Sequence, residues 1–365
     1  MRTQSNFRLL VVRLGAMGDI LHALPAVTAL RQAHPHWVID WVVEPRWRAL
    51  LAADASAGFP DARSPAQPLV DHLHFAATKV WRKAPFSAKT LHEIKALRRD
   101  LQAGGYSAVI DLQGAIRSAI VGSMAGCRRR IGEAEPRERP ARWLFTEPVT
   151  TCGVHVIEQD VELASAIAGD DLKPARPLLP VDAAAEAWAD AILPQGEDQP
   201  AVLINPGAGW GAKCWPVERY ASVAQGLIGR GLRVLVNAGP GEVPLADAIV
   251  QQTGGAATPL TCTLGQLIAL TRRVALAIAG DTGPLHLACA LGRPVVGIYG
   301  PTDPSRNGPY GTRFEVLRSP VSRRDHSRRA EPEAGLLTIP PEEVLRAADE
   351  LLCHEPDNGS ARFRF

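Results

Sequence analysis

The chain has 365 residues and a formal net charge of +2, with 46% hydrophobic and 21% charged residues. These proportions are ordinary for a folded globular protein and exclude wholesale disorder, and the length is sufficient for two domains. Because the charge is nearly balanced, attraction to an anionic partner has to come from local patches rather than from the chain as a whole.

Cysteine usage and the apolar segments indicate the compartment. The six cysteines form no CxxC pair and no zinc-finger spacing, which favours a reducing compartment over a disulfide framework or a structural metal. The apolar run at residues 7–12 is too short for a signal peptide and predicts a buried strand. No apolar stretch approaches the roughly 20 residues that span a bilayer. We therefore expect a cytoplasmic protein without a membrane span, and peripheral membrane contact stays open.

The first half of the chain alternates short apolar runs with longer helical patterns, which predicts a parallel sheet with crossover helices. Strands are expected at residues 9–12, 37–43, 70–74 and 108–112. Helices are expected at residues 19–31, 88–102, 116–125 and 156–168. The polar, proline-bearing stretch 170–177 has the composition of a linker.

The second half repeats this alternation. Strands are expected at residues 201–204, 233–237, 274–279 and 294–299. Helices are expected at residues 216–229, 244–252, 264–271 and 284–291, and a last one at 341–352 could pack on either domain. Each strand ends in glycine, proline or small polar residues, and open parallel sheets bind ligands beyond the carboxyl ends of their strands. We therefore expect two similar α/β domains that face a central cleft, at residues 1–175 and 176–340, with a helix and tail at 341–365.

The most informative segment is AGDTGPLHLA at residues 279–288, where a strand ends, a tight turn follows and a helix begins. The amide groups at such a helix start, together with the helix dipole, favour a diphosphate. Thr282 can donate a hydroxyl, Gly283 lets the backbone approach closely, and His286 lies within reach of a phosphate oxygen. Taken singly, Asp281 or Thr282 could instead cap the helix, and His286 could be a core residue. The combination favours a phosphate site.

Two further loops of the second half carry charged residues. The loop at 205–216 has three glycines within five residues and presents Lys213, and a cation there suits a departing diphosphate. The alternative for Lys213 is a solvated lysine on an ordinary loop. Glu242 follows the glycine turn at 239–241, where a carboxylate could bind two ribose hydroxyls or simply serve the helix N-terminus.

The first strand is followed by RLGAMGDILH, whose glycine spacing differs from the GxGxxG dinucleotide fingerprint. Asp19 is expected at the turn or at the first helical residue, with its side chain facing the interdomain cleft. A carboxylate at that position could take the proton of an attacking hydroxyl, and an N-cap role is equally compatible with the sequence.

Basic residues cluster in three segments, at 79–83, 128–142 and 323–329. Arginine binds carboxylates and phosphates bidentately, so such clusters suit an acidic glycolipid at a negatively charged membrane surface. A solvated charged face is the alternative. Nucleic acid is not expected as a partner, because the overall charge is nearly neutral and no recognition module is present.

These segments together resemble the bacterial lipopolysaccharide heptosyltransferases of glycosyltransferase family 9, and most of all the heptosyltransferase I branch. The matching segments span about residues 8–304 in the same order, and GDTGPLHLA and GPTDP are the ones most specific to the family. The matching segments are VVRLGAMGDILHALPAVTALR, IDWVVE, WRKAPFSA, YSAVIDLQG, KCWP and AGDTGPLHLACALGRPVVGIYGPTDP.

The resemblance implies a GT-B fold of two Rossmann-like domains and an inverting, metal-independent transfer of L-glycero-D-manno-heptose from ADP-heptose to Kdo of Kdo–lipid A. It implies no cofactor besides the donor substrate, and it implies work at the cytoplasmic face of the inner membrane. By motif match, Asp19 is the general base and Lys213 assists departure of ADP. The implied donor-binding residues are Glu242, Asp281, Thr282, Gly283 and His286. The implied acceptor-binding residues are Arg82 and Lys83.

Four departures from the branch leave alternatives open. In one departure, Pro284 and Leu285 resemble the wider family more than this branch. Gly15 and Ala16 stand where it has a serine pair, Lys79 and Val80 stand where it has arginines, and residues 305–365 find no clear match. Heptosyltransferase II, another family 9 transferase, and a non-catalytic nucleotide-sugar or glycolipid-binding protein are the alternatives. A sugar epimerase or dehydrogenase is disfavoured by the missing GxGxxG and YxxxK motifs.

Overall fold

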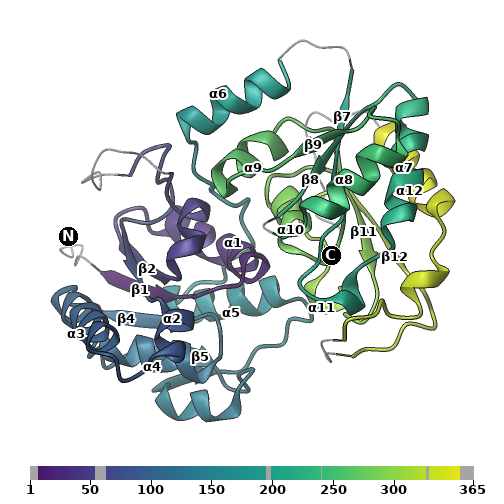
Figure 1. Ribbon diagram of the computed structural model, residues 1–365. Coiled ribbons are helices and arrows are strands. Elements are labelled where there is room, and N and C mark those ends of the chain that lie inside the picture. Colours follow the sequence, from purple (N-terminus) through teal and green to yellow (C-terminus); the bar gives the residue numbers. More distant parts are fainter. Residues whose placement is uncertain (1–6, 54–62, 195–198, 240, 326–328, 354–365) are drawn as a thin grey trace. The chain divides into compact units, whose positions relative to one another are not determined.

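The computed structural model describes residues 7–53, 63–194, 199–239, 241–325 and 329–353. The chain divides into two compact units, Met1–Asp182 and Ala183–Phe365. Each unit consists of one parallel sheet with helices packed along it (Figure 1). The α/β class expected from the alternation of strands and helices is therefore confirmed in both units.

The sheet of the first unit has six parallel strands in the order β3-β2-β1-β4-β5-β6. The strands are β1 (Arg8–Val12), β2 (Val38–Val43), β3 (His72–Phe75), β4 (Ala108–Asp111), β5 (Arg130–Glu133) and β6 (Glu147–Val149). The helices are α1 (Met17–Ala33), α2 (Thr78–Lys83), α3 (Ala88–Ala103), α4 (Ile116–Met124) and α5 (Val156–Ala168), with 3-10 turns η1 (Pro45–Leu50) and η2 (Arg139–Leu144).

The interior of this unit explains why the sequence folds this way. Strand β1 pairs with β2 on one side and β4 on the other, so its apolar run is buried on both faces. Helix α1 is buried along most of its length and packs against α5. Residues 170–177, predicted as a linker, lie in the first unit, where the backbone N–H of Ala175 donates to the carbonyl of Pro25 at 3.3 Å.

The sheet of the second unit has six parallel strands in the order β12-β11-β10-β7-β8-β9. The strands are β7 (Ala201–Asn205), β8 (Arg233–Asn237), β9 (Thr258–Leu260), β10 (Leu276–Gly280), β11 (Val295–Tyr299) and β12 (Phe314–Arg318). The helices are α6 (Ala183–Ile192), α7 (Val217–Gly229), α8 (Val243–Gln252), α9 (Leu264–Thr271), α10 (Gly283–Ala290), α11 (Pro304–Asn307) and α12 (Pro341–Cys353), with 3-10 turns η3 (Gly211–Lys213) and η4 (Leu336–Thr338).

The expected elements are confirmed within two residues at each end, and the largest shifts, of two residues, are at the starts of β3 and β10 and at both ends of α1. Strand β3 begins two residues after its predicted start, because pairing with β2 begins at His72 although Val70 is fully buried. The final helix α12, whose partner the sequence left open, packs against α7 and the sheet of the second unit. The tail at 354–365 lies outside the described residues. The elements that the sequence analysis missed are β5, β6, β9, β12, α2, α6, α11 and the 3-10 turns.

Chain order reverses between β1 and β4 in the first sheet and between β10 and β7 in the second. Loops that leave neighbouring strands at such a point run to opposite sides, which opens a crevice at the carboxyl ends. Arg13 follows β1 directly, and Asp281 follows β10 directly. The topology therefore places one predicted segment of each unit at its own switch point.

Candidate active-site residues

A buried ion pair occupies the switch point of the second unit. The Lys213 Nζ donates to Oδ2 of Asp281 and lies 3.3 Å from the Asp281 carbonyl oxygen. On the other side, Nε2 of His286 lies 3.2 Å from Oδ1 of Asp281. The three side chains retain only 11%, 8% and 6% of their exposure, in the order Lys213, Asp281, His286. The predicted alternative of a solvated Lys213 is therefore wrong.

The electrostatics of this group keep Asp281 ionised. Burial by itself raises the pKa of a carboxyl, but the hydrogen bond and charge of His286, together with Lys213, more than offset it and hold the pKa of Asp281 well below its ordinary value. The ring of Trp210 lies 4.3 Å from the Lys213 Nζ, in cation–π geometry. The ammonium is thus held between an aromatic face and a carboxylate.

Helix α10 begins beside this group, and its N-terminus is built for an anion. Thr282 occupies the N-cap without a side-chain capping bond, and its hydroxyl donates instead to the Gly280 carbonyl at 3.2 Å. The Asp281 carboxylate serves Lys213 and His286, so the predicted capping alternative is wrong for both residues. Pro284 has no N–H, so the first-turn donors without a partner within the helix are the amides of Gly283 and Leu285.

Glu242 connects the loops that follow β7 and β8. It precedes α8, and its Oε2 accepts the backbone N–H of Gly239 at 2.9 Å. A Cβ added to Gly207 would lie 2.0 Å from the Glu242 carboxyl carbon, so a side chain there would displace this carboxylate. The neighbouring Asn205 is buried, and its Nδ2 has no hydrogen-bond partner among the described residues, while its Oδ1 accepts from Asn237 at 2.8 Å.

A distant part of the chain holds the Lys213 loop. The N–H of Ala212 donates to the carbonyl of Arg329 at 3.1 Å, and the N–H of Glu333 donates to the carbonyl of Ala212 at 3.2 Å. A Cβ on Gly211 would lie 1.6 Å from the Ala330 carbonyl oxygen. The last residue of the third basic segment, Arg329, therefore contacts the loop that carries Lys213, whereas Arg328 lies outside the described residues.

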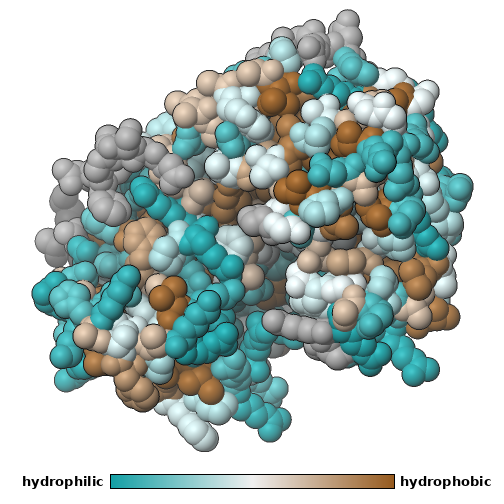
Figure 2. Space-filling view, viewed as in Figure 1, coloured by the Kyte–Doolittle hydropathy of each residue, from teal (hydrophilic) through white to brown (hydrophobic). Residues whose placement is uncertain are grey.

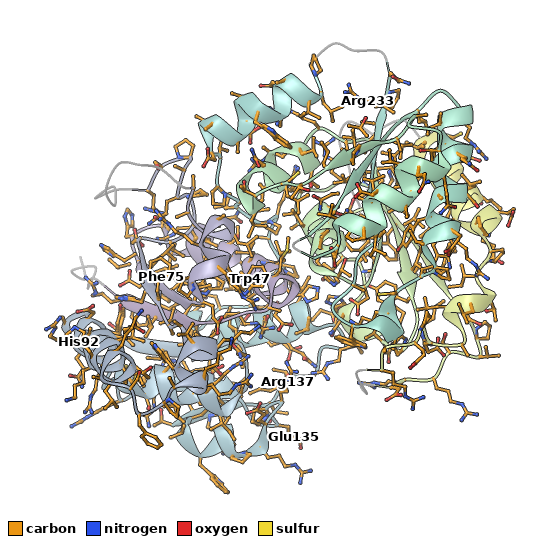
Figure 3. The ribbon with its side chains drawn as sticks, viewed as in Figure 1. Trp47, Phe75, His92, Glu135, Arg137 and Arg233 are labelled. Atoms are coloured by element: carbon orange, nitrogen blue, oxygen red, sulfur yellow. The ribbon has the colours of Figure 1, made fainter. Side chains whose placement is uncertain are left out.

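Asp19 lies in the first turn of α1 at the switch point of the first unit. Its Oδ2 accepts the backbone N–H of Ala16 at 3.0 Å, and its Oδ1 lies 3.5 Å from Nη2 of the buried Arg13. The side chain remains 32% exposed. Gly15 leaves no room for a side chain, since a Cβ there would lie 2.6 Å from Nε1 of Trp47, which is labelled beside α1 in Figure 3.

Two buried carboxyls that the sequence analysis did not single out lie near Arg13. Burial raises the pKa of Asp111 to about 6, although the residue accepts the N–H groups of Gln113 and Gly114 at 2.8 and 2.9 Å. Burial, joined by the charges of Asp19 and other carboxyls, raises the pKa of Asp160 to about 7. The DLQG segment was the available signal for Asp111, whereas nothing in its own helix distinguishes Asp160.

Cations also gather at α2 in the first unit. Arg82 and Lys83 end this helix and are exposed. Desolvation, followed by the charges of Arg46, Arg117 and Arg82, lowers the pKa of Lys79, so these side chains are close enough to interact. The predicted acceptor residues thus belong to a larger positive group.

Within the described residues, no helix is long and apolar enough to cross a membrane. The same residues contain no group of three or more His, Cys, Asp or Glu side chains placed to hold a metal ion.

Two Rossmann-like sheets, each with charged side chains at its switch point, are the architecture of glycosyltransferases with the GT-B fold. The profile of glycosyltransferase family 9 (heptosyltransferase) matches residues 94–336, and the chain belongs to this family.

Individual relatives agree with this assignment. The chain is 30% identical over 318 residues to lipopolysaccharide heptosyltransferase 1 of Escherichia coli strain K12, covering 86% of this chain and 94% of that protein. It is 31% identical over 320 residues to lipopolysaccharide heptosyltransferase 1 of Salmonella typhimurium strain LT2, with coverage of 86% and 94%. The structure of E. coli heptosyltransferase WaaC with ADP matches with a TM-score of 0.75 at 28% identity, covering 94% of this chain and 100% of that one. The predicted resemblance and the GT-B fold are confirmed.

Proposed function

We propose that this family 9 enzyme transfers L-glycero-D-manno-heptose from ADP-heptose to Kdo of Kdo–lipid A, with inversion at the anomeric carbon. The relatives named heptosyltransferase 1 support the reaction, at 30% and 31% identity over most of the chain. The observation that carries the proposal is the Lys213–Asp281–His286 group at the start of α10. It joins a held cation to unpaired helix amides, which is what a departing diphosphate requires. We expect no metal ion and no cofactor besides the donor.

The donor half of the site follows from these side chains. The diphosphate accepts hydrogen bonds from the first-turn amides of α10, with Thr282, Gly283 and His286 around it. Lys213 balances the charge that builds on ADP as the glycosidic bond breaks. Asp281 orients Lys213 and His286 rather than binding phosphate itself, because a carboxylate repels an anion. Glu242 accepts from ribose hydroxyls.

The transfer is a single displacement. The acceptor hydroxyl loses its proton to the Asp19 carboxylate, its oxygen bonds to the anomeric carbon, and the bond from that carbon to the β-phosphate breaks on the opposite face. Support for this role is that Asp19 is partly exposed and is oriented through both carboxylate oxygens, by the Ala16 N–H and by Arg13. A fixed, accessible carboxylate is what general-base catalysis needs.

The acceptor half rests on the positive group at α2. Arg82 and Lys83 would contact the carboxylate and phosphate groups of the acidic acceptor, with Lys79 and Arg117 close by. Because the acceptor is a membrane lipid, the enzyme works as a peripheral protein at the cytoplasmic face of the inner membrane.

Mass spectrometry of the products from ADP-heptose and purified Kdo–lipid A tests the proposal. We expect one added heptose on Kdo and one ADP released for each. With Asp19→Asn the rate should fall by about 10²–10⁴-fold, while binding of ADP-heptose stays close to that of the parent. Near-normal turnover by the variant would remove Asp19 as the base.

The acceptor itself is tested by substitution in the same assay. If heptose is added only to an acceptor that already carries a first heptose, the chain is a heptosyltransferase II. If no acceptor stimulates ADP release, the chain is a binding protein.

A further inference from the structure

The first unit exposes several large apolar side chains within one stretch of sequence. Phe86 is 89% exposed, Trp143 84% and Val80 57%, and Ile120 and Ile116 are 44% and 39% exposed. Isolated exposed apolar residues are ordinary on any protein surface, but a gathered set marks a binding surface. What matters is therefore whether these residues share one face.

Packing and charge bring α4 together with η2 and α2. Ile116 and Ile120 are four residues apart and lie on the same side of α4. Ala119 of the same helix packs against Ala141 and Phe145, which places η2 alongside α4.

Two further contacts complete the surface. The start of α4 is tied to the segment before η2, because the N–H of Ile116 donates to Oε2 of Glu138 at 2.8 Å. Trp81 of α2 and Val121 of α4 belong to the same buried hydrophobic cluster, and the charge of Arg117 at the start of α4 acts on Lys79 of α2, so α2 lies along this surface. Figure 2 shows apolar residues gathered among hydrophilic ones on the lower left of the molecule, over the first unit.

Cations surround these apolar side chains. Arg82, Lys83, Arg117 and Arg139 are exposed, and Arg142 is half-buried. Glu138 lies nearby, and its carboxylate is already bonded to the α4 backbone. Apolar tips ringed by arginine and lysine match the boundary between acyl chains and headgroups of an anionic bilayer.

We propose that the α2–α4–η2 face, defined by Val80, Ile116, Ile120 and Trp143 with the surrounding cations, docks on anionic phospholipid. The inference rests on the proposed function, because a lipid-anchored acceptor brings the enzyme to such a surface. Trp143 and Ile120 enter the headgroup region, and the arginines stay at phosphate level. The predicted acceptor residues Arg82 and Lys83 belong to the same face, so docking presents them to the acceptor.

Vesicle flotation of the full-length protein tests docking without any transfer assay. The variant Ile116→Ser/Ile120→Ser/Trp143→Ser removes apolar tips of α4 and η2, and the matched control Val321→Ser/Leu337→Ser removes two exposed apolar side chains of the second unit. With vesicles of phosphatidylethanolamine and phosphatidylglycerol, the parent and the control should bind, and the triple variant should bind about tenfold more weakly or not at all. Binding of the parent should weaken at high salt and be absent with phosphatidylcholine alone.

Three results would overturn the proposal. They are equal binding by the parent and the triple variant, equal loss in the control, and salt-independent binding to neutral vesicles. Misfolding of the triple variant is monitored by its melting temperature, and Arg139→Gln/Arg142→Gln provides a second variant, expected to reduce the salt dependence.

Transfer assays separate this proposal from the proposed function. The triple variant should transfer heptose to a deacylated, water-soluble Kdo acceptor at the parent rate, and lose activity only when the acceptor is embedded in vesicles. If the parent transfers to neither acceptor, the proposed function fails, yet vesicle binding still decides the docking surface. If the triple variant loses both activities equally, the face has another role.

Discussion

The two units share a six-stranded parallel sheet with a switch point, and they treat buried charge in opposite ways. In the second unit, Asp281 lies between Lys213 and His286, and its pKa is held low. In the first unit, Asp111 and Asp160 are buried carboxyls whose pKa is raised to about 6 and about 7. The same topology thus supports a permanently charged group in one unit and carboxyls that titrate near neutrality in the other.

The physical reason is the number of partners. A buried carboxylate needs hydrogen bonds and opposite charge to remain ionised. Asp281 receives both, whereas Oδ2 of Asp160 has no hydrogen-bond partner among the described residues. In the first unit Arg13 acts on Asp19, Asp111 and Asp160 together, so its single positive charge serves three carboxyls.

The largest expected effect comes from Asp281→Asn, which removes the buried carboxylate that pairs with Lys213 in the second unit. Removing this charge leaves the buried Lys213 ammonium without its counter-ion, which should destabilise the fold by about 3–5 kcal/mol. Transfer should fall by at least about 100-fold, because Lys213 loses its orientation toward the diphosphate. Thermal unfolding and titration with ADP measure the two effects.

The pH dependence of the parent follows from the same pair. The pKa of Asp281 is lower in the folded chain than in the unfolded one, so its contribution to stability is present above the unfolded value of about 4 and is lost as the pH falls further. The difference in free energy of unfolding between the parent and Asp281→Asn should therefore become smaller only in strong acid. A difference that stays constant down to pH 2 would contradict the pairing of Asp281 with Lys213.

The opposite sign is expected for Asp160→Asn. A pKa raised to about 7 means that the folded chain binds this proton more tightly than the unfolded chain does. Stability of the parent should then fall as the pH rises from about 4 to about 7, and the variant should lack this slope. Relative to the parent, the free energy of unfolding of Asp160→Asn should increase by about 2–4 kcal/mol between pH 4 and pH 8. Denaturant unfolding at several pH values measures it, with the exposed Asp170→Asn as control. A parallel pH profile would show that Asp160 is ionised.

The sequence predicts best what is local. Helix α9 agrees with its predicted range, since Thr263 and Gln266 form a capping box at its start. Strands β1 and β7 were evident because their apolar runs are buried on both faces. The missed strands β6 and β9 have three residues each and lie at sheet edges, where a proline is tolerated and no apolar run is required.

In the candidate site, too, the local features could be predicted from the sequence and the long-range contacts could not. The turn at 281–286 and the glycine-rich loop of Lys213 could be recognised from motifs. The contact between them joins residues 68 positions apart, and no local pattern encodes such a pairing. Asp160 could not be foreseen for the same reason, because its pKa depends on burial and on charges from several other elements.

The smallest expected effect tests a difference in how Asp19 and the loop of Lys213 are held in position. Asp19 is oriented by its own turn, through Ala16, whereas the loop of Lys213 is held by residues 329–333. In Gly211→Ala the new Cβ would lie 1.6 Å from the Ala330 carbonyl oxygen, and because that contact is backbone, the loop itself has to move. We expect a loss of about 1–3 kcal/mol in stability and a raised KM for ADP-heptose.

The matched control is Gly209→Ala in the same loop, where a Cβ meets nothing within 4 Å. Gly209→Ala should leave the stability and the KM for ADP-heptose close to those of the parent. An effect seen only in Gly211→Ala then reports the contact with Ala330 rather than loop stiffness. Asp19-dependent chemistry should stay intact in both variants, since nothing in the turn of Asp19 depends on residues 329–333. The rate of transfer at saturating ADP-heptose tests whether this chemistry is unchanged. In Gly211→Ala that rate should change much less than the KM for ADP-heptose. A fall in that rate with KM unchanged would mean that the distant segment governs chemistry instead of donor binding.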